Sequence, residues 1–174
     1  ANPAELDYSL GSLSRPDSMH GAESAAKLLA DALMADQSIL IVGDFDADGA
    51  TSSALAVLAL SAMGGRADYL VPNRFDYGYG LTPEIVAVAE IDAPDMLVTV
   101  DNGISSIEGV VAAKDKGMSV IITDHHLPGS ELPIADVIVN PNQADCDFPS
   151  KNLAGVGVIF YVLSALRAEL RNRN

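Results

Sequence analysis

Five short apolar runs that alternate with longer helical patterns constrain the fold of this 174-residue chain more than any other feature. The runs are rich in Val, Ile and Leu on both faces, which is typical of strands buried between two layers of helices. They lie at Ser38–Gly43, Ala67–Val71, Met96–Val100, Met118–Thr123 and Asp136–Asn140. This alternation predicts an α/β fold with a doubly wound, mainly parallel five-stranded sheet and helices on both faces.

The segments between these runs show helical periodicity and helix-end signals. Thr82-Pro83-Glu84 is typical of a helix start, and Gly64-Gly65 and Gly117 are typical of helix ends. The helices are therefore expected at 19–34, 50–63, 82–90, 104–116 and 155–170. Residues 1–18 show little periodicity, so we expect a lead-in segment there and one lobe over 19–174.

Metal-ligand residue types gather where three of the predicted strands end. They are Asp44, Asp46 and Asp48 after the first strand, Asp101 after the third, and Asp124, His125 and His126 after the fourth. Ligands bind beyond the carboxyl ends of open parallel sheets, so these side chains are expected on one rim. Crowded carboxylates repel each other unless cations neutralise them. Mixed Asp and His ligands suit Mn, Fe, Co or Zn, whereas Asp with water alone suits Mg.

Simpler explanations account for each motif on its own. DFDADG resembles the start of a calcium loop, but the twelfth position counted from Asp44 is Leu55 rather than Glu. Asp48 before Gly49 could cap a helix, DNG is a common turn, and a histidine pair is often a surface feature. The coincidence of all three at strand ends favours a metal site.

Composition gives weaker constraints on function and location. The chain has 10 basic and 24 acidic residues, a formal charge of −14, whereas phosphate backbones attract Lys and Arg. This objection to nucleic-acid binding weakens if the acids hold cations. Cys146 is the sole cysteine and is expected to be an ordinary reduced thiol, and no signal or membrane segment is apparent. We therefore expect a cytoplasmic protein with no membrane association, and a structural role for His20.

The motifs resemble those of the DHH phosphoesterase superfamily and, within it, the RecJ group of single-strand DNA exonucleases. The resemblance rests on GDFDADGATS, VPNRFDYGYGL, VTVDNGISS, TDHHLPG, VNPNQADCDFPS and LAGVGVIFY, from about Ser38 to Leu170. It implies a metal-dependent exodeoxyribonuclease of DNA repair and recombination that releases 5′-mononucleotides from single-stranded DNA in the 5′-to-3′ direction. It also implies a two-metal site for Mn²⁺ or Mg²⁺. Single-strand-binding protein and other repair proteins are candidate partners.

The same resemblance implies roles for individual residues. The implied metal ligands are Asp44, Asp46, Asp48, Asp101 and His125, and the implied catalytic residues are Asp46, Asp48, Asp101, His125 and His126. Asp101 would bridge the two metals and His126 would contact phosphate. Asp124 would orient a histidine without binding metal itself.

Two further segments offer candidates for substrate binding. Arg74 could pair with phosphate and Tyr77 or Tyr79 could stack on a base, although a Gly-rich connection with packed tyrosines is the alternative. Gly155 and Gly157 could admit a phosphate at a helix start, and close packing of that helix is the alternative.

One departure from the family pattern concerns the end of the chain. Full-length relatives carry a further metal-binding aspartate and then a second, substrate-binding lobe. Asp136, Asp145 and Asp147 lie in a different sequence context from that aspartate. We therefore expect a fragment of a longer protein that is weakly active or inactive alone.

Three other functions remain open from the sequence. Another DHH phosphoesterase would act on oligonucleotides, cyclic dinucleotides or pyrophosphate. A receiver-like signalling domain would bind Mg²⁺ without being an enzyme, but it needs a Lys after the last strand, where this chain has NPNQ. The third is an interaction module in a repair complex.

Overall fold

The computed structural model describes residues 9–173 and contains a five-stranded sheet of order β2-β1-β3-β4-β5. All four strand pairings are parallel. The strands are β1 (Ser38–Gly43), β2 (Arg66–Leu70), β3 (Met96–Val100), β4 (Ser119–Thr123) and β5 (Val137–Val139). The predicted fold class is confirmed, and the predicted strand ends differ from these by at most one residue.

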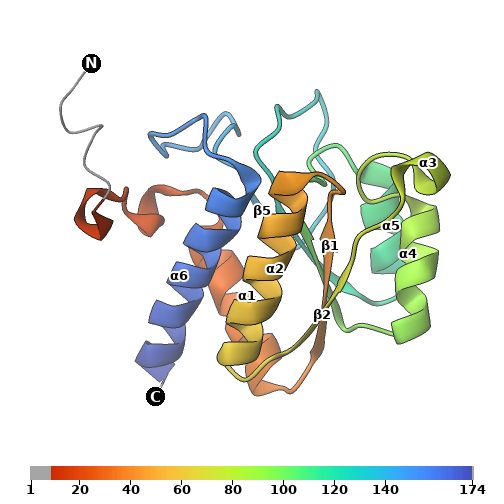
Figure 1. Ribbon diagram of the computed structural model, residues 1–174, viewed down its shortest axis with the longest axis horizontal. Coiled ribbons are helices and arrows are strands. Elements are labelled where there is room, and N and C mark those ends of the chain that lie inside the picture. Colours follow the sequence, from red (N-terminus) through yellow and green to blue (C-terminus); the bar gives the residue numbers. More distant parts are fainter. Residues whose placement is uncertain (1–8, 174) are drawn as a thin grey trace.

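Helices cover both faces of the sheet (Figure 1). One face carries α1 (Ala22–Met34), α2 (Ala47–Ala62) and α6 (Gly155–Arg173), and the other carries α4 (Pro83–Ala89) and α5 (Ile107–Asp115). Successive strand side chains point to opposite faces. Ile39 and Ile41 therefore join the first core, while Leu40 and Val42 join the second.

Strand β2 is less buried than its sequence predicted. It lies at the edge of the sheet, and the side chain of Tyr69 is 61% exposed. Burial on both faces was expected from its apolar run, but an edge strand has a neighbour on one side only. A short helix, α3 (Arg74–Tyr77), follows β2 and was not predicted.

The expected lead-in segment contains two short 3-10 helices, η2 (Leu10–Ser12) and η3 (Pro16–Ser18). Met19 then enters the core beside α1 and α6. The adjacent His20 has Nδ1 3.4 Å from a carboxylate oxygen of Asp145, and its N–H donates to the buried thiol of Cys146. These contacts join the start of α1 to a distant loop. Within residues 9–173, no helix combines the length and hydrophobicity needed to cross a membrane.

Candidate metal centre

The strand order reverses between β1 and β3, because β2 lies on one side of β1 and all later strands lie on the other. In open parallel sheets, such a switch point leaves a crevice beyond the carboxyl ends where ligands bind. Asp44 follows β1, Asp101 follows β3, and Asp124 follows β4. The topology thus brings the three predicted motifs to one rim of the sheet.

Two groups of candidate ligands share Asp101. The ligand atoms of Asp44, Asp46 and Asp101 all lie within 4.8 Å of one another, and so do those of Asp101, His125 and His126. The Nε2 atom of His125 is 3.0 Å from Oδ1 of Asp101. Two ligand groups that share one carboxylate are compatible with a two-metal site.

Asp101 is both strained and electrostatically disfavoured without a cation. Its φ of 62° is in the left-handed region, which costs a non-glycine residue about 1 kcal/mol or more. Its side chain is 2% exposed, and its buried Oδ1 accepts no hydrogen bond. Burial, followed by repulsion from Asp48 and Asp46, raises the pKa of Asp101 to about 7. A divalent cation fits here, since it would supply the missing partner.

The turn from β1 into α2 presents the first two aspartates. A Cβ atom at Gly49 would lie 2.2 Å from the carbonyl oxygen of Asp44, so this close turn requires glycine. Asp46 caps α2 by accepting a hydrogen bond from the N–H of Gly49 at 3.0 Å. The capping residue is therefore Asp46, whereas the sequence had suggested Asp48.

Asp124 organises the histidine loop from a buried position. Its Oδ1 accepts hydrogen bonds from the backbone N–H groups of His125 and His126 at 2.7 and 3.1 Å, and lies 2.7 Å from Nδ1 of His126. Its Oδ2 accepts from the N–H of Ile104 at 2.9 Å. Burial acts to lower the pKa of His126, but the hydrogen bond and charge of Asp124 outweigh it and raise this pKa. The ring that Asp124 orients is that of His126.

Comparison with known proteins identifies a family with this site. The model of the DHH family, N-terminal domain, matches residues 38–174. The chain belongs to the DHH family. The resemblance seen in its motifs is thereby confirmed.

The similar DHH proteins include exonucleases. The chain is 54% identical over 171 residues to the single-stranded-DNA-specific exonuclease RecJ of Haemophilus influenzae, covering 98% of this chain and 30% of that protein. A crystal structure of exonuclease RecJ bound to manganese matches with a TM-score of 0.80 and 37% identity, over 87% of this chain and 38% of the other. RecJ of Thermus thermophilus in complex with Mn²⁺ matches with a TM-score of 0.75 and 34% identity, over 88% and 22%. The chain thus spans about 30% of the length of its curated RecJ relative.

Asp48, the third aspartate of the first DHH motif, contacts α6 instead of joining a ligand group. Its Oδ2 accepts a hydrogen bond from the N–H of Gly155 at 2.7 Å, and its Oδ1 accepts from that of Val156 at 2.8 Å. It lies 3.6 Å from Nε2 of His125 and belongs to neither ligand group. Asp48 thus caps the start of α6 in this structure, and its role as a metal ligand stays a prediction.

The same contacts bear on the two glycines that were candidates for phosphate binding. The N–H of Gly155 already donates to Asp48, and that of Gly157 is bonded within its own turn. A Cβ atom would lie 2.7 Å from the Asp101 side chain at Gly155, and 2.4 Å from Leu153 at Gly157. These contacts favour the alternative expectation of close packing: Gly155 lets α6 approach Asp101, and Gly157 lets Leu153 pack against the first turn of α6.

Three asparagines that support the DHH centre were missed by the sequence reasoning. The side-chain amide of Asn102 donates to carbonyl groups at the ends of β1 and β3. Asn140 donates to the carbonyl of His126 at 2.9 Å, and Asn142 donates to that of His125. The DNG and VNPN runs contained the signal, but the backbone groups that they reach are set by the fold.

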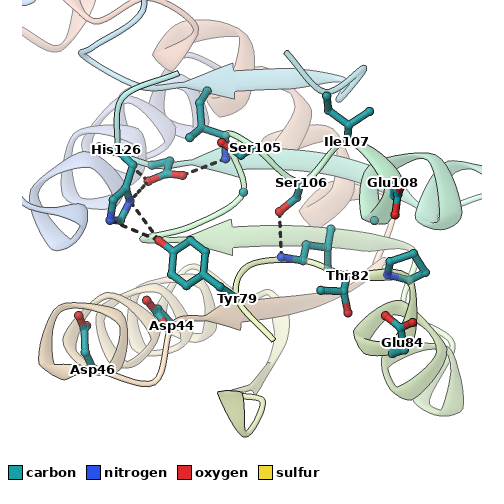
Figure 2. Close-up of a pocket in the computed structure, with 16 residues that line it drawn as sticks. Asp44, Asp46, Tyr79, Thr82, Glu84, Ser105, Ser106, Ile107, Glu108 and His126 are labelled. Carbon is teal, nitrogen blue, oxygen red and sulfur yellow. Dashed lines mark hydrogen bonds and ion pairs between the residues drawn. The ribbon is translucent and has the colours of Figure 1, made fainter. Parts of the chain in front are cut away.

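The loop after β2 places one of its three candidates at the centre. The hydroxyl of Tyr79 lies 3.3 Å from Nε2 of His126, and the two rings meet edge to face (Figure 2). Tyr77 lies in α3 and is exposed. Arg74 begins α3, but its side chain lies outside the described part of the structure.

The acids downstream of the DHH motif belong to neither ligand group. Asp136 forms an ion pair with Lys114 at 2.6 Å, and Asp145 pairs with His20. Asp147 is exposed. These positions agree with the expectation that none of the three matches the further metal-binding aspartate of the family.

Proposed function

We propose that this chain is the metal-binding lobe of a single-stranded-DNA-specific 5′-to-3′ exonuclease that uses Mn²⁺ or Mg²⁺. The observation that carries the proposal is the pair of ligand groups sharing Asp101 at the switch point of the sheet. Further support comes from the similar proteins, which are named single-stranded-DNA-specific exonuclease RecJ, and from RecJ structures with Mn²⁺ or Mg²⁺. Mixed carboxylate and imidazole ligands suit Mn²⁺.

Each residue of the site has a proposed task. Two divalent ions held here would polarise the phosphodiester, lower the pKa of a water molecule and stabilise the leaving oxygen. Asp101 would contact both ions, since its carboxylate belongs to both groups. Asp44 and Asp46 complete one group, and His125 and His126 complete the other, in which we assign His125 to the metal. His126 is fixed by Asp124 and faces the adjoining pocket, so we assign it to the substrate phosphate.

The proposal is tested on the protein at its natural full length, loaded with Mn²⁺. Hydrolysis of 5′-phosphorylated single-stranded DNA is compared with hydrolysis of duplex DNA, dinucleotides and pyrophosphate. We expect mononucleotides to be released from the 5′ end of single strands. Mn²⁺ binding is measured by calorimetry for Asp46→Ala and His125→Ala, which should each lose affinity while folding is retained. Asp145→Ala, an exposed acid away from the site, is the matched control.

Two results would count against this function. Preferential hydrolysis of pyrophosphate or dinucleotides would assign the chain to another activity of the DHH family. If the Mn²⁺ affinity is unchanged in both Asp46→Ala and His125→Ala, the proposed metal site is wrong.

A further inference from the structure

The two histidines of the DHH motif are held in different ways. The ring of His126 is supported by Asp124, whose Oδ1 lies 2.7 Å from Nδ1 of that ring. Among the described residues, the ring of His125 has polar contacts only with Asp101 and Asp48, at 3.0 and 3.6 Å. Asp101 and His125 are candidate ligands of the same cation, so neither can serve as the fixed support of the other. The direction of the His125 ring therefore depends on its backbone.

The backbone of His125 is held on both sides. Its N–H donates a hydrogen bond to Oδ1 of Asp124 at 2.7 Å, and its carbonyl accepts one from the side-chain amide of Asn142. Histidines that bind metals depend on such neighbouring hydrogen bonds for their orientation. Asn142 lies 17 residues beyond His125 in the sequence, outside the DHH motif, and reaches it only in the folded chain.

Asn142 is itself fixed by the segment that follows β5. Its N–H donates to Oδ1 of Asn140 at 2.8 Å, and the fully buried Asn140 donates in turn to the carbonyl of His126. The carbonyl of Pro141, between the two asparagines, accepts a hydrogen bond from Nζ of Lys151 at 2.6 Å. These bonds form within the folded chain without a cation. The support of His125 is thus in place before metal binds, which reduces the ordering that binding requires.

We propose that Asn142 is a positioning residue, which sets the direction of the His125 ring and thereby the affinity of the metal centre for its cation. This role rests on the proposed function, because it takes His125 as a metal ligand. It deepens that function by adding a residue that contacts no metal and still controls how tightly the metal is held. His126 depends less on this segment, because Asp124 supports its ring directly.

The first test removes the amide that reaches His125. Mn²⁺ binding to the full-length protein is measured by calorimetry for Asn142→Leu and Gln143→Leu, since leucine has a branched side chain but no N–H to donate. Gln143 is the matched control, because its amide in the same segment donates to the carbonyls of Ile138 and Asn140 and to no histidine. We expect Asn142→Leu to weaken Mn²⁺ binding by about tenfold, whereas Gln143→Leu should leave it unchanged.

The second test asks whether Asn142 acts through His125. The change in Mn²⁺ affinity caused by Asn142→Leu is measured again in a protein that carries His125→Ala. A positioning residue acts only through the ligand that it orients, so no further loss is expected in that protein. A general loosening of the segment would instead weaken Mn²⁺ binding by the same factor with and without His125.

The outcomes separate the role of Asn142 from the proposed function. If Asn142→Leu binds Mn²⁺ as tightly as Gln143→Leu, or if its loss is the same with and without His125, the positioning role is wrong and the metal site stands. If His125→Ala binds Mn²⁺ as tightly as wild type, His125 is no ligand, which contradicts its task in the proposed function and the positioning role with it. Circular dichroism checks folding, and Asn142→Ala takes the place of Asn142→Leu if the leucine variant does not fold.

Discussion

The two ends of the sheet place aspartates in opposite environments. At the amino ends of the strands, Asp95 accepts hydrogen bonds from the N–H and hydroxyl of Ser38 at 2.8 and 2.9 Å, which lower the pKa of Asp95. Burial acts to raise the pKa of Asp136, but the hydrogen bond and charge of Lys114, together with the hydrogen bond from the N–H of Val120, outweigh burial and lower this pKa. At the carboxyl ends, burial and neighbouring acids raise the pKa of Asp101 to about 7.

The difference shows which acids serve the fold and which serve the site. The folded chain itself supplies partners for Asp95 and Asp136, so their ionised forms stabilise it. The buried Oδ1 of Asp101 lies 3.0 Å from Nε2 of His125 but accepts no hydrogen bond, and burial and neighbouring acids make the ionised form of Asp101 oppose folding until a cation binds. The metal centre is therefore expected to lower the stability of the metal-free protein, while the opposite end of the sheet raises it.

The largest expected effect comes from Asp101→Asn, which removes the destabilising buried charge from the metal centre. Both ligand groups lose a shared charged ligand, so Mn²⁺ affinity should fall by about 100-fold or more and DNA hydrolysis should be lost. The pKa of Asp101 is higher in the folded state, so ionisation costs wild-type stability as pH rises from about 4 to 7. In EDTA at pH 8, the variant should thus be more stable than wild type by roughly 2 kcal/mol, measured by urea unfolding.

A stability difference of the opposite sign would contradict the claim that the Asp101 carboxylate destabilises the metal-free protein. If Asp101→Asn were less stable than wild type in EDTA at pH 8, the carboxylate would be stabilising the metal-free fold. Unfolding of both proteins at pH 3 supplies the control. There Asp101 is protonated in both states, so the difference should largely disappear.

A smaller effect is expected from Asp48→Ala, which tests whether Asp48 binds metal or stabilises the start of α6. The variant leaves the N–H groups of Gly155 and Val156 at the start of α6 without their acceptor, so stability should fall by about 2 kcal/mol. Mn²⁺ affinity should change little, whereas Asp46→Ala should lose it. Urea unfolding and calorimetry on the two variants measure both quantities. A fall in Mn²⁺ affinity as large as that of Asp46→Ala, with stability kept, would restore Asp48 as a ligand.

The sheet and the position of the site could be predicted because each depends on local patterns. The apolar runs set the strands, and the carboxyl ends of parallel strands then meet at one rim. The contact of Asp48 with the start of α6 could not be predicted, since its partner Gly155 lies 107 residues away in the sequence. The exposure of Tyr69 was also missed, because an apolar run does not reveal that its strand lies at the edge of the sheet.

The smallest expected effect is that of Asp136→Asn, at the end of the sheet opposite to the metal centre. Asp136 also accepts a hydrogen bond from the N–H of Val120, so losing its charge should cost about 1 kcal/mol at pH 7. The pKa of Asp136 is lower in the folded state, so its contribution is present above about pH 4 and is lost as pH falls further. Urea unfolding at pH 7 and pH 2.5 compares Asp136→Asn with wild type, and the free energy of unfolding should differ only at pH 7. Asp145→Asn, at an exposed position, is the control and should match wild type at both pH values. Mn²⁺ affinity should be unchanged, because the Asp136 carboxylate is already paired with Lys114 and the N–H of Val120 and lies away from the metal centre. A loss of Mn²⁺ affinity in Asp136→Asn would show that the two ends of the sheet are coupled and that their acids cannot be assigned separately.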